Sequence, residues 1–180
     1  MLNQGFLLFV LLGAFQPQKI VPVWSPDGTV QNLIVEQEVL TPDSCPATRP
    51  DSTRFVPPPP YAPVAPFLGS FWYGSEALWA MPSSDGVWHG LVTPQGIRNK
   101  VFWWSSEWDW RSELNPALTV TAKRLDGDAP SLRVFPATNA HNTADIHHAM
   151  LVALDIPTPG CWELTGEYKG HTLSYVVWVP

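Results

Sequence analysis

Hydrophobic and polar residues alternate most regularly near the end of the chain. In the run Trp162–Tyr168, positions 162, 164 and 168 are apolar, whereas positions 163, 165 and 167 are polar. Successive side chains of a β-strand point to opposite faces, so a period of two indicates a strand with one buried face. The run Thr172–Val179 repeats this period, with an inward face of Leu173, Tyr175, Val177 and Val179. With Lys169-Gly170 as a tight turn, the two runs predict a terminal β-hairpin.

Short segments with strand character alternate with turn residues from Gly69 onward. Turns such as Ser83-Ser84-Asp85-Gly86 and Pro157-Thr158-Pro159-Gly160 separate these segments. The predicted strands are Glu76–Met81, Gly86–Leu91, Arg98–Ser105, Ala117–Arg124, Leu132–Phe135, His148–Ile156, Cys161–Tyr168 and Thr172–Val179. Their regular spacing and the lack of an amphipathic helical period predict an all-β sandwich of about seven or eight strands.

Residues 15–66 differ in composition from the rest of the chain. Lys19–Trp24 and Thr29–Val35 flank Ser25-Pro26-Asp27-Gly28, which is typical of a type I turn, and predict either a hairpin or an arm on the main domain. Proline is abundant from Thr41 to Pro66, and the run Pro57–Pro60 favours an extended polyproline II conformation. This segment is either a linker or a strap held to the domain by Cys45, Tyr61 and Phe67.

The first residues have the character of an export signal. An apolar run extends from Phe6 to Phe15, which is about half the length of a spanning helix and matches a signal-peptide core. The small residue Ala14 fits a cleavage site, so the predicted signal peptide is residues 1–14. Residues 1–4 lack the Lys or Arg that usually precedes such a core, and a buried N-terminal strand is the alternative. No cysteine lies beside Ala14, so lipid attachment is not expected.

Composition limits the classes of function. The chain has 180 residues, of which 45% are hydrophobic, and this supplies enough apolar surface for a folded core. Its 20 prolines argue against long helices. The chain has 10 Lys and Arg residues and 16 Asp and Glu residues, so no basic patch is expected. Nucleic acid and anionic membrane surfaces are therefore poor partners.

Two cysteines, Cys45 and Cys161, are the only ones in the chain. Neither has a second Cys or His at the spacing of a zinc ribbon or a thioredoxin-like motif. In an oxidising compartment the simplest outcome is one disulfide between them, and two free buried thiols are the alternative.

A resemblance adds to this interpretation. The stretch from Ile156 to Gly166, followed by Leu173–Val177, resembles the C-terminal signature of a group of uncharacterised secreted bacterial proteins. Cys45-Pro46-Ala47-Thr48 is similar to the segment that opens those proteins, and their middle motifs are similar to Leu78-Trp79, Trp103-Trp104 and Arg124-Leu125-Asp126-Gly127. The resemblance implies an immunoglobulin-like β-sandwich and implies no known activity.

Three histidines and a carboxylate lie close together at His141, Asp145, His147 and His148. Neutral imidazoles and carboxylates are the ligands that zinc and copper prefer, so this segment is a candidate metal site. On a strand, however, Asp145 and His147 share a face while His148 points away. A solvated polar loop that leads into a strand is the simpler interpretation.

Aromatic residues are concentrated around Trp103, Trp104, Trp108 and Trp110, more rings than one strand can bury on a single face. Exposed indoles beside Glu107 and Asp109 can stack on sugar rings or on prolines of another chain. The alternative is that Pro57–Pro60 and Tyr61 pack on these tryptophans within the same chain.

Catalysis has little support in the sequence. There is no GxSxG motif and no glycine-rich loop of the kind that cradles phosphate. Asp126 and Asp128 lie in a Gly/Pro turn, which favours a turn-forming role over an acid–base pair. No catalytic residue and no cofactor are therefore expected.

These observations predict an immunoglobulin-like sandwich over residues 67–180, behind a signal peptide at 1–14 and an N-terminal, proline-rich arm at 15–66. The predicted protein is a non-enzymatic module, secreted or held in the periplasm or cell envelope, with a structural or interaction role and an unknown protein or polysaccharide as partner. Carbohydrate binding through the tryptophans and metal binding through the histidines are the alternatives.

Overall fold

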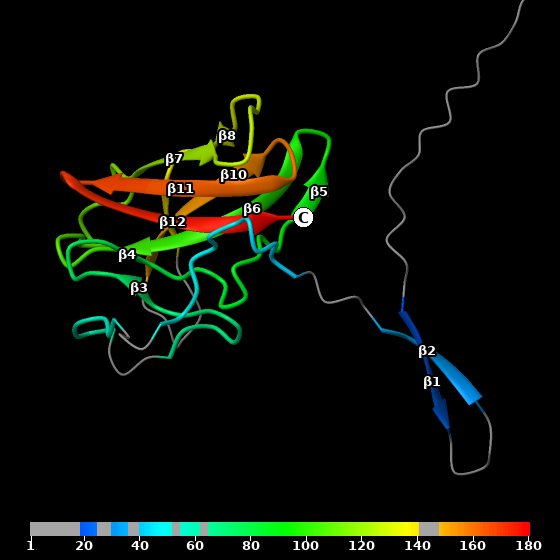
Figure 1. The fold of residues 1–180 in the computed structure, drawn as a ribbon. Helices are drawn as coiled ribbons and strands as arrows, with labels where there is room; N and C mark the ends of the chain where they lie inside the picture. The colour runs from blue at the N-terminus through cyan, green and yellow to red at the C-terminus, as the bar shows by residue number, and fades with distance from the viewer. Residues whose placement is uncertain (1–18, 25–29, 36–39, 52–54, 62–64, 141–147) are drawn as a thin grey trace, which may run out of the picture. The chain divides into compact units, whose positions relative to one another are not determined.

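The computed structural model of the chain describes residues 19–24, 30–35, 40–51, 55–61, 65–140 and 148–180. The chain divides into two compact units, Met1–Glu38 and Val39–Pro180. Within the described ranges all strands pair antiparallel and no helix occurs, so the predicted all-β class is confirmed (Figure 1). The same ranges hold no apolar helix of membrane-spanning length. The predicted signal peptide, residues 1–14, lies outside the described residues.

The first unit contains the predicted N-terminal hairpin. Strand β1 (Lys19–Trp24) pairs antiparallel with β2 (Val30–Val35), and the register runs from Lys19 opposite Val35 to Trp24 opposite Val30. The turn between the two strands, predicted at residues 25–28, lies outside the described residues.

The second unit, here called the body, contains two sheets. The three-stranded sheet has the order β12-β11-β7, and in the larger, seven-stranded sheet the path β3-β4-β6-β10-β8 is joined by β5 beside β6 and β9 beside β10. The strands of the larger sheet are β3 (Tyr73–Gly74), β4 (Trp79–Ala80), β5 (Leu91–Thr93), β6 (Gly96–Trp104), β8 (Arg133–Val134), β9 (Thr138–Ala140) and β10 (Ala149–Ile156). Those of the smaller sheet are β7 (Thr119–Arg124), β11 (Gly160–Tyr168) and β12 (His171–Val179).

The core lies between the two sheets. The ring of Trp103 on β6 packs on the ring of Tyr175 on β12, with their centroids 5.6 Å apart. Alternate residues of β10 and β11 supply buried aliphatic side chains, among them Met150, Val152, Leu154, Ile156 and Leu164. Sheets that share an interdigitated core in this way form a sandwich, and each fully buried side chain of this size contributes about 1.5–3 kcal/mol.

The predicted terminal hairpin is confirmed. Strands β11 and β12 pair along their full length, from Gly160 opposite Val179 to Tyr168 opposite His171. The turn residues Lys169 and Gly170 both have positive φ, which a two-residue hairpin turn requires. The predicted inward positions of both strands are buried, except that Leu173 is only half-buried.

The strand count differs from the prediction. The described part of the body has ten strands, because several two- and three-residue pieces extend the larger sheet. The predicted strand Gly86–Leu91 is wrong: Leu91 begins β5, whereas residues 86–88 leave the larger sheet and bridge to the smaller one at Trp178.

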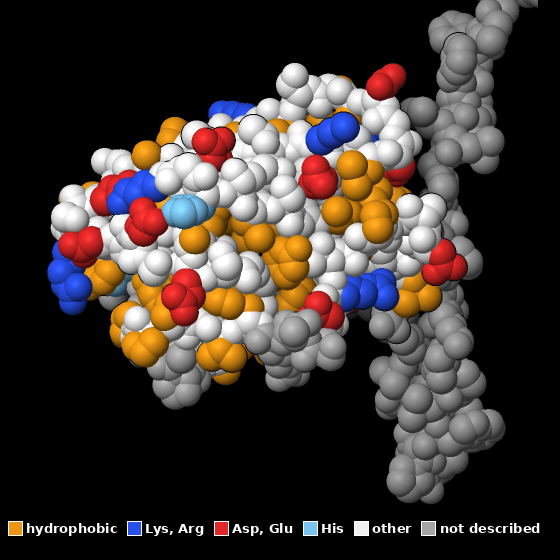
Figure 2. Space-filling model, turned by 60° about the vertical axis from the view of Figure 1, so that its left-hand side comes forward, with side chains coloured by type: hydrophobic (Ala, Val, Ile, Leu, Met, Phe, Trp, Pro, Cys, Tyr) orange, Lys and Arg blue, Asp and Glu red, His pale blue; other side chains and the backbone are white. Residues whose placement is uncertain are grey.

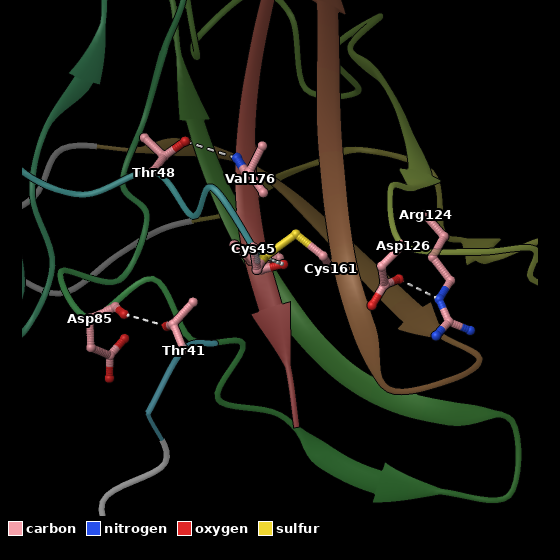
Figure 3. The surroundings of a disulfide bond; sticks show 9 residues. Thr41, Cys45, Thr48, Asp85, Arg124, Asp126, Cys161 and Val176 are labelled. Atoms are coloured by element: carbon pink, nitrogen blue, oxygen red, sulfur yellow. Dashed lines mark hydrogen bonds and ion pairs between the residues drawn. A yellow bond between two sulfur atoms is a disulfide. The ribbon is translucent and has the colours of Figure 1, made fainter. Parts of the chain in front are cut away.

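The proline-rich segment belongs to the body, so the structure places the body's start near Val39, earlier than the predicted residue 67. The disulfide between Cys45 and Cys161 is present, with 5.5 Å between the Cα atoms. Thr48 accepts a hydrogen bond from the Val176 backbone, next to this disulfide (Figure 3). The predicted strap is thus observed, and the predicted disulfide is confirmed.

The run of four prolines is not a continuous polyproline II segment. The backbone N–H of Tyr61 donates to the carbonyl of Pro58, and residues 59–61 form a turn. This turn aims the Tyr61 ring at Trp79, 5.2 Å away between ring centroids. The proline run therefore ends in a tertiary contact instead of an extended rod.

Candidate functional site

An unpaired stretch interrupts one edge of strand β6. Strand β10 pairs with β6 continuously from Ile97 to Trp103 on one side. On the opposite side, β5 pairs with residues 96–98 and β4 pairs with residues 103–104. No strand of the described chain pairs with residues 99–102 on that side. We call this stretch the open edge of β6.

Backbone polar groups of the open edge point into this interruption. The N–H of Phe135 donates to the carbonyl of Ala153, so Ala153 directs its polar groups away from its β6 partner, Lys100. In an antiparallel ladder such pairs alternate with hydrogen-bonded ones, and the backbone groups of Lys100 and Phe102 therefore point toward the open edge. The N–H of Lys100 donates to the side chain of Asn99. Among the described residues, none bonds to the Lys100 carbonyl or the Phe102 N–H.

The segment between β4 and β5 keeps the edge open because it is fastened elsewhere. The N–H of Trp88 donates to the carbonyl of Trp178 at 2.7 Å, and the N–H of Trp178 donates to the carbonyl of Gly86 at 2.8 Å. Gly86 has φ 72°, and a Cβ placed there would lie 2.7 Å from the Cβ of Ala47. A larger residue at this position would collide with the strap, so glycine is required.

Asp85 organises the same segment. Its Oδ1 atom accepts hydrogen bonds from the Ser83 hydroxyl and the Val87 N–H, both at 2.8 Å. Its Oδ2 atom lies 2.6 Å from Nε2 of His89. Burial alone would raise the pKa of the Asp85 carboxyl, but the hydrogen bonds from Val87, Ser83 and His89 outweigh burial and lower it. The Asp85 carbonyl also accepts a bond from the hydroxyl of Thr41 in the strap (Figure 3).

The groups around Asp85 do not form a nucleophilic triad. In such a triad the histidine lies between the hydroxyl and the carboxylate, because it must take the proton of the hydroxyl. Here Asp85 lies between Ser83 and His89 and accepts from both of its partners. The arrangement shapes a turn and presents a polar rim.

A recess of about 330 Å³ lies against the open edge. Its apolar walls come from both sheets and from the connecting segments, and include Phe67, Met81, Val87, Val101, Phe102 and Val177. Polar side chains that line it are Asp85, His89, Asn99 and Lys100. Pockets of this size, with mostly apolar walls and a few polar groups, are typical of ligand sites.

Tyr175 is the most buried hydroxyl-bearing side chain of the recess, at 3% exposure. Within the described part of the chain no residue forms a hydrogen bond with its hydroxyl. The hydroxyl oxygen is not among the unpaired polar atoms that are closed off from solvent, and the Tyr175 side chain lines the recess. Burial raises the pKa of the Tyr175 phenol. The recess is therefore lined by a neutral hydroxyl that can donate and accept a hydrogen bond and that has no partner among the described residues.

Hydrophobic side chains also reach the surface. Figure 2 shows one face of the molecule, on which hydrophobic side chains gather in patches between scattered acidic and basic residues. Beside the recess, Leu68 is fully exposed and Phe67 is 39% exposed. The Phe67 ring meets the Phe102 ring edge-on, with 5.8 Å between their centroids. The mouth of the recess is thus apolar on one side and polar on the other.

The predicted tryptophan surface is not exposed. Trp103 and Trp104 are fully buried and Trp108 is 5% exposed, so the expectation of an exposed indole platform is wrong for these three residues. Trp103 faces the core between the sheets, and Trp104 packs edge-on against Trp72. Trp108 donates its indole N–H to the Glu113 carbonyl.

Trp110 is only partly buried, yet both faces of its ring carry partners. His148 stacks on it with 3.6 Å between the ring centroids, and the Arg111 guanidinium lies 4.3 Å from the ring centroid. The sequence shows how many rings there are, but not that β6 has partners on both faces. Tyr175 of the smaller sheet packs on Trp103, and Phe67 and Trp72 pack on the rings of the other face.

Most of the predicted metal site lies outside the described residues. Positions His141, Asp145 and His147 fall in that undescribed part, whereas His148 belongs to the stack on Trp110. Among the residues that the structure does describe, no group of three potential ligands is close enough to hold a metal ion.

The signature residues meet around the disulfide. Arg124 lies opposite Trp162 in the β7–β11 pair and donates from Nε to Oδ1 of Asp126 at 2.7 Å. A Cβ at Gly160 would lie 2.6 Å from the same Nε atom. The hydrogen bond from Arg124 outweighs burial and lowers the pKa of the Asp126 carboxyl. Asp126 lies in the bend that follows β7, and its carboxylate is held there by Arg124 (Figure 3).

Comparisons with protein-family models, with curated proteins and with solved structures found no match for this chain.

The sequence did not predict the open edge of β6 or the recess beside it. Their signal is the sequence Ser83–His89, in which a turn is followed by residues that alternate like a strand but bond to the other sheet.

Proposed function

We propose that this protein is a non-enzymatic β-sandwich module, secreted or held at the cell envelope, that binds a partner in the recess beside β6. The observation that carries the proposal is the Tyr175 hydroxyl, which has no partner among the described residues although the residue is only 3% exposed. Polar groups of largely buried side chains are usually hydrogen-bonded. A hydroxyl of a side chain that lines the recess and is not paired within the described fold is suited to pair with a ligand.

The chemistry of the described carboxylates supports a binding role over a catalytic one. Asp85, Glu113 and Asp155 all have lowered pKa values, which keeps them ionised. Each is held by hydrogen bonds that fix a turn, a loop or a strand pair. Asp85 also accepts from the Ser83 hydroxyl, but no histidine lies between the two groups to take the proton of the hydroxyl. A general acid or base would instead need a pKa near the working pH.

The disulfide supports the proposed location. Cys45 and Cys161 are bonded in the folded body, and such bonds persist in oxidising compartments. The apolar run at residues 6–15 supplies the matching export signal in the sequence. We further propose that the chain belongs to the secreted group that its signature resembles, since Arg124, Asp126, Gly160 and Trp162, which come from separate parts of the signature, lie side by side.

Site-specific photo-crosslinking tests the binding proposal. A photoreactive amino acid replaces Leu68, which is fully exposed at the mouth of the recess, in the full-length chain expressed by its own cells. The matched control carries the same amino acid at Leu114, which is 63% exposed and is not part of the recess. We expect a discrete adduct from position 68 that position 114 does not give. Equal labelling at both positions, or none at either, overturns the proposal.

Protein purified from the same cells tests the proposed export. The adduct at position 68 also tests carbohydrate as the alternative ligand. Mass spectrometry of the purified protein should show a chain that begins near residue 15, whereas an intact Met1 on a cytoplasmic species contradicts export. If the adduct at position 68 carries sugar and no peptide, the partner is a carbohydrate.

A further inference from the structure

We propose that the open edge of β6 binds an extended peptide segment of another protein, which joins the seven-stranded sheet as a short strand between β5 and β4. This inference rests on the proposed function, because it names the class of partner for the same recess. Strand addition of this kind draws affinity from main-chain hydrogen bonds and specificity from pockets for alternate side chains.

The free backbone groups have the arrangement that strand pairing uses. The Lys100 carbonyl and the Phe102 N–H flank Val101, and both point away from β10. A strand that runs past Val101 in either direction donates one N–H to the carbonyl and accepts one bond from the N–H. A third group, the Lys100 N–H, is held by the Asn99 side chain and becomes available when that amide rotates.

The open edge of β6 lies between strands β5 and β4 on the same side of β6. Strands β5 and β4 pair with the two ends of β6 on the same side, so an added strand continues the sheet that they define. Residues 99–102 offer roughly 13 Å of edge at about 3.3 Å per residue. That length matches a segment of about four residues.

Side chains of the added strand would point to two faces of the sheet that differ in their surroundings. Alternate residues of a strand point to opposite faces. One set faces Tyr175 and Val177, where a modest apolar side chain fits and the Tyr175 hydroxyl can bond to an adjacent polar atom. The other set faces Phe67 and Phe102 on the outer side of β6. An extended peptide with apolar residues at alternate positions satisfies both.

Self-pairing is disfavoured by charge. Lys100 is exposed on the open edge, so the pairing of two copies along this edge would bring two like charges together. The whole chain also carries a formal net charge of −6, so two copies repel each other. These charges favour a partner other than a second copy.

Amide hydrogen exchange on the full, disulfide-bonded chain tests the proposal. Seven-residue peptides are selected from a random displayed library against the chain, and the enriched peptides are synthesised with capped ends. We expect them to slow the exchange of the Phe102 amide by about tenfold or more. The Val101 amide, which already points toward β10, is the internal control and should not change.

Two comparisons separate backbone pairing from other binding. N-methylation at alternate residues removes the N–H donors of a peptide and should abolish binding in one of the two methylation registers. Phe102→Pro removes the free donor of the edge, whereas Phe102→Ala keeps it and loses the same ring contacts with Phe67 and Trp104. We expect the alanine variant to bind and the proline variant not to bind. If the proline variant fails to fold, the N-methylated peptides still decide.

Three results overturn the inference. These are enriched peptides that bind equally well in both methylation registers, enriched peptides that leave the Phe102 amide unprotected, and a library that yields no peptide with preference for the native chain over Phe102→Pro. An adduct at position 68 together with any of these results means that the recess binds its partner through side chains, and the proposed function then stands without strand addition.

Discussion

Gly166 of β11 lies directly against the indole of Trp103 on β6. A Cβ on Gly166 would be 2.6 Å from Cζ3 of that ring, and the ring is fully buried between the two sheets. Gly166→Ala should therefore lower the free energy of unfolding by about 1–3 kcal/mol, because an overpacked core must shift. Urea-induced unfolding measures this loss.

Glu167→Ala is the control for that experiment, since Glu167 is the next residue of β11 and is exposed. Its replacement should change stability by less than about 0.5 kcal/mol. Equal stabilities for the native chain and Gly166→Ala would show that the two sheets are not in close contact at this point.

Trp162 and Trp108 should both be required for stability. The sequence predicts this for Trp162 alone, but the side chains are 2% and 5% exposed respectively. Replacement of either by alanine removes a large buried ring and should cost about 3–5 kcal/mol. Val92→Ala, at a position that is 88% exposed, is the neutral comparison in thermal melts. A Trp108→Ala variant as stable as the native chain would contradict the burial of Trp108.

Two buried tyrosines of the terminal hairpin should respond in opposite ways to the loss of their hydroxyls. The Tyr168 hydroxyl donates to Oε2 of Glu113 at 2.5 Å, and hydrogen bonds to charged groups contribute about 1.5–3 kcal/mol. Tyr168→Phe should therefore destabilise the chain. Tyr175→Phe removes a hydroxyl without a partner among the described residues and should leave stability equal or higher.

Chemical unfolding of the two phenylalanine variants checks the contrast, and the photo-crosslinking yield at position 68 supplies a second readout. Tyr175→Phe should lower that yield even though the fold is intact. A marked loss of stability in Tyr175→Phe would reveal a structural role for the hydroxyl.

The Cys45–Cys161 bond should contribute strongly to stability. The two residues are 116 positions apart, and closing so long a loop contributes about 4–5 kcal/mol in the chain-entropy model. A Cys45→Ala/Cys161→Ala double variant should melt at a markedly lower temperature than the oxidised chain. Peptide mapping without a reducing agent provides the covalent check, and two alkylatable thiols in the folded, secreted protein would contradict the bond.

Stability should fall in acid partly through Asp155. Arg98 donates to both carboxylate oxygens of this fully buried residue, at 2.6 and 2.8 Å, and these bonds hold the pKa of Asp155 below its usual value. A folded-state pKa below the unfolded value adds stability above about pH 4, and this contribution is lost as the pH falls through the folded-state pKa.

Asp155→Asn should therefore be less stable than the native chain at pH 7, and the difference should shrink as the pH falls from 4 toward 2. Urea midpoints across this range measure it, with Asp128→Asn as an exposed control. A difference that widens in acid would contradict the assigned ion pair.

The sequence was sufficient for features that depend on local pattern. Alternation from Trp162 to Val179 predicted the terminal hairpin and its inward face because the burial period of a strand is visible in one segment. The two cysteines had no other partner, so their pairing followed once oxidation was assumed. Short turns such as Pro157-Thr158-Pro159-Gly160 were predicted because proline fixes φ and glycine readily adopts positive φ.

Features that depend on which elements meet were not predictable in the same way. The residues Val87–His89 alternate like a strand, but their backbone bonds with Trp178 draw them to the other sheet. The tryptophans at residues 103–110 were too numerous for one strand to bury, and the contacts that cover them, such as that of Trp72 with Trp104, are tertiary. The open edge exists only because β4 and β5 stop short of each other, which no local pattern encodes.

The disulfide also determines how the body carries mechanical load. Tension applied at residue 40 passes through Cys45 and the sulfur atoms to Cys161, and then follows the chain through the terminal hairpin. Residues 46–160, which include the whole seven-stranded sheet, are bypassed by this covalent shortcut. A pull on the two ends of the body therefore loads the short strap before Cys45 and the strands β11 and β12 directly. It reaches the seven-stranded sheet only through the contacts that the sheet makes with these strands.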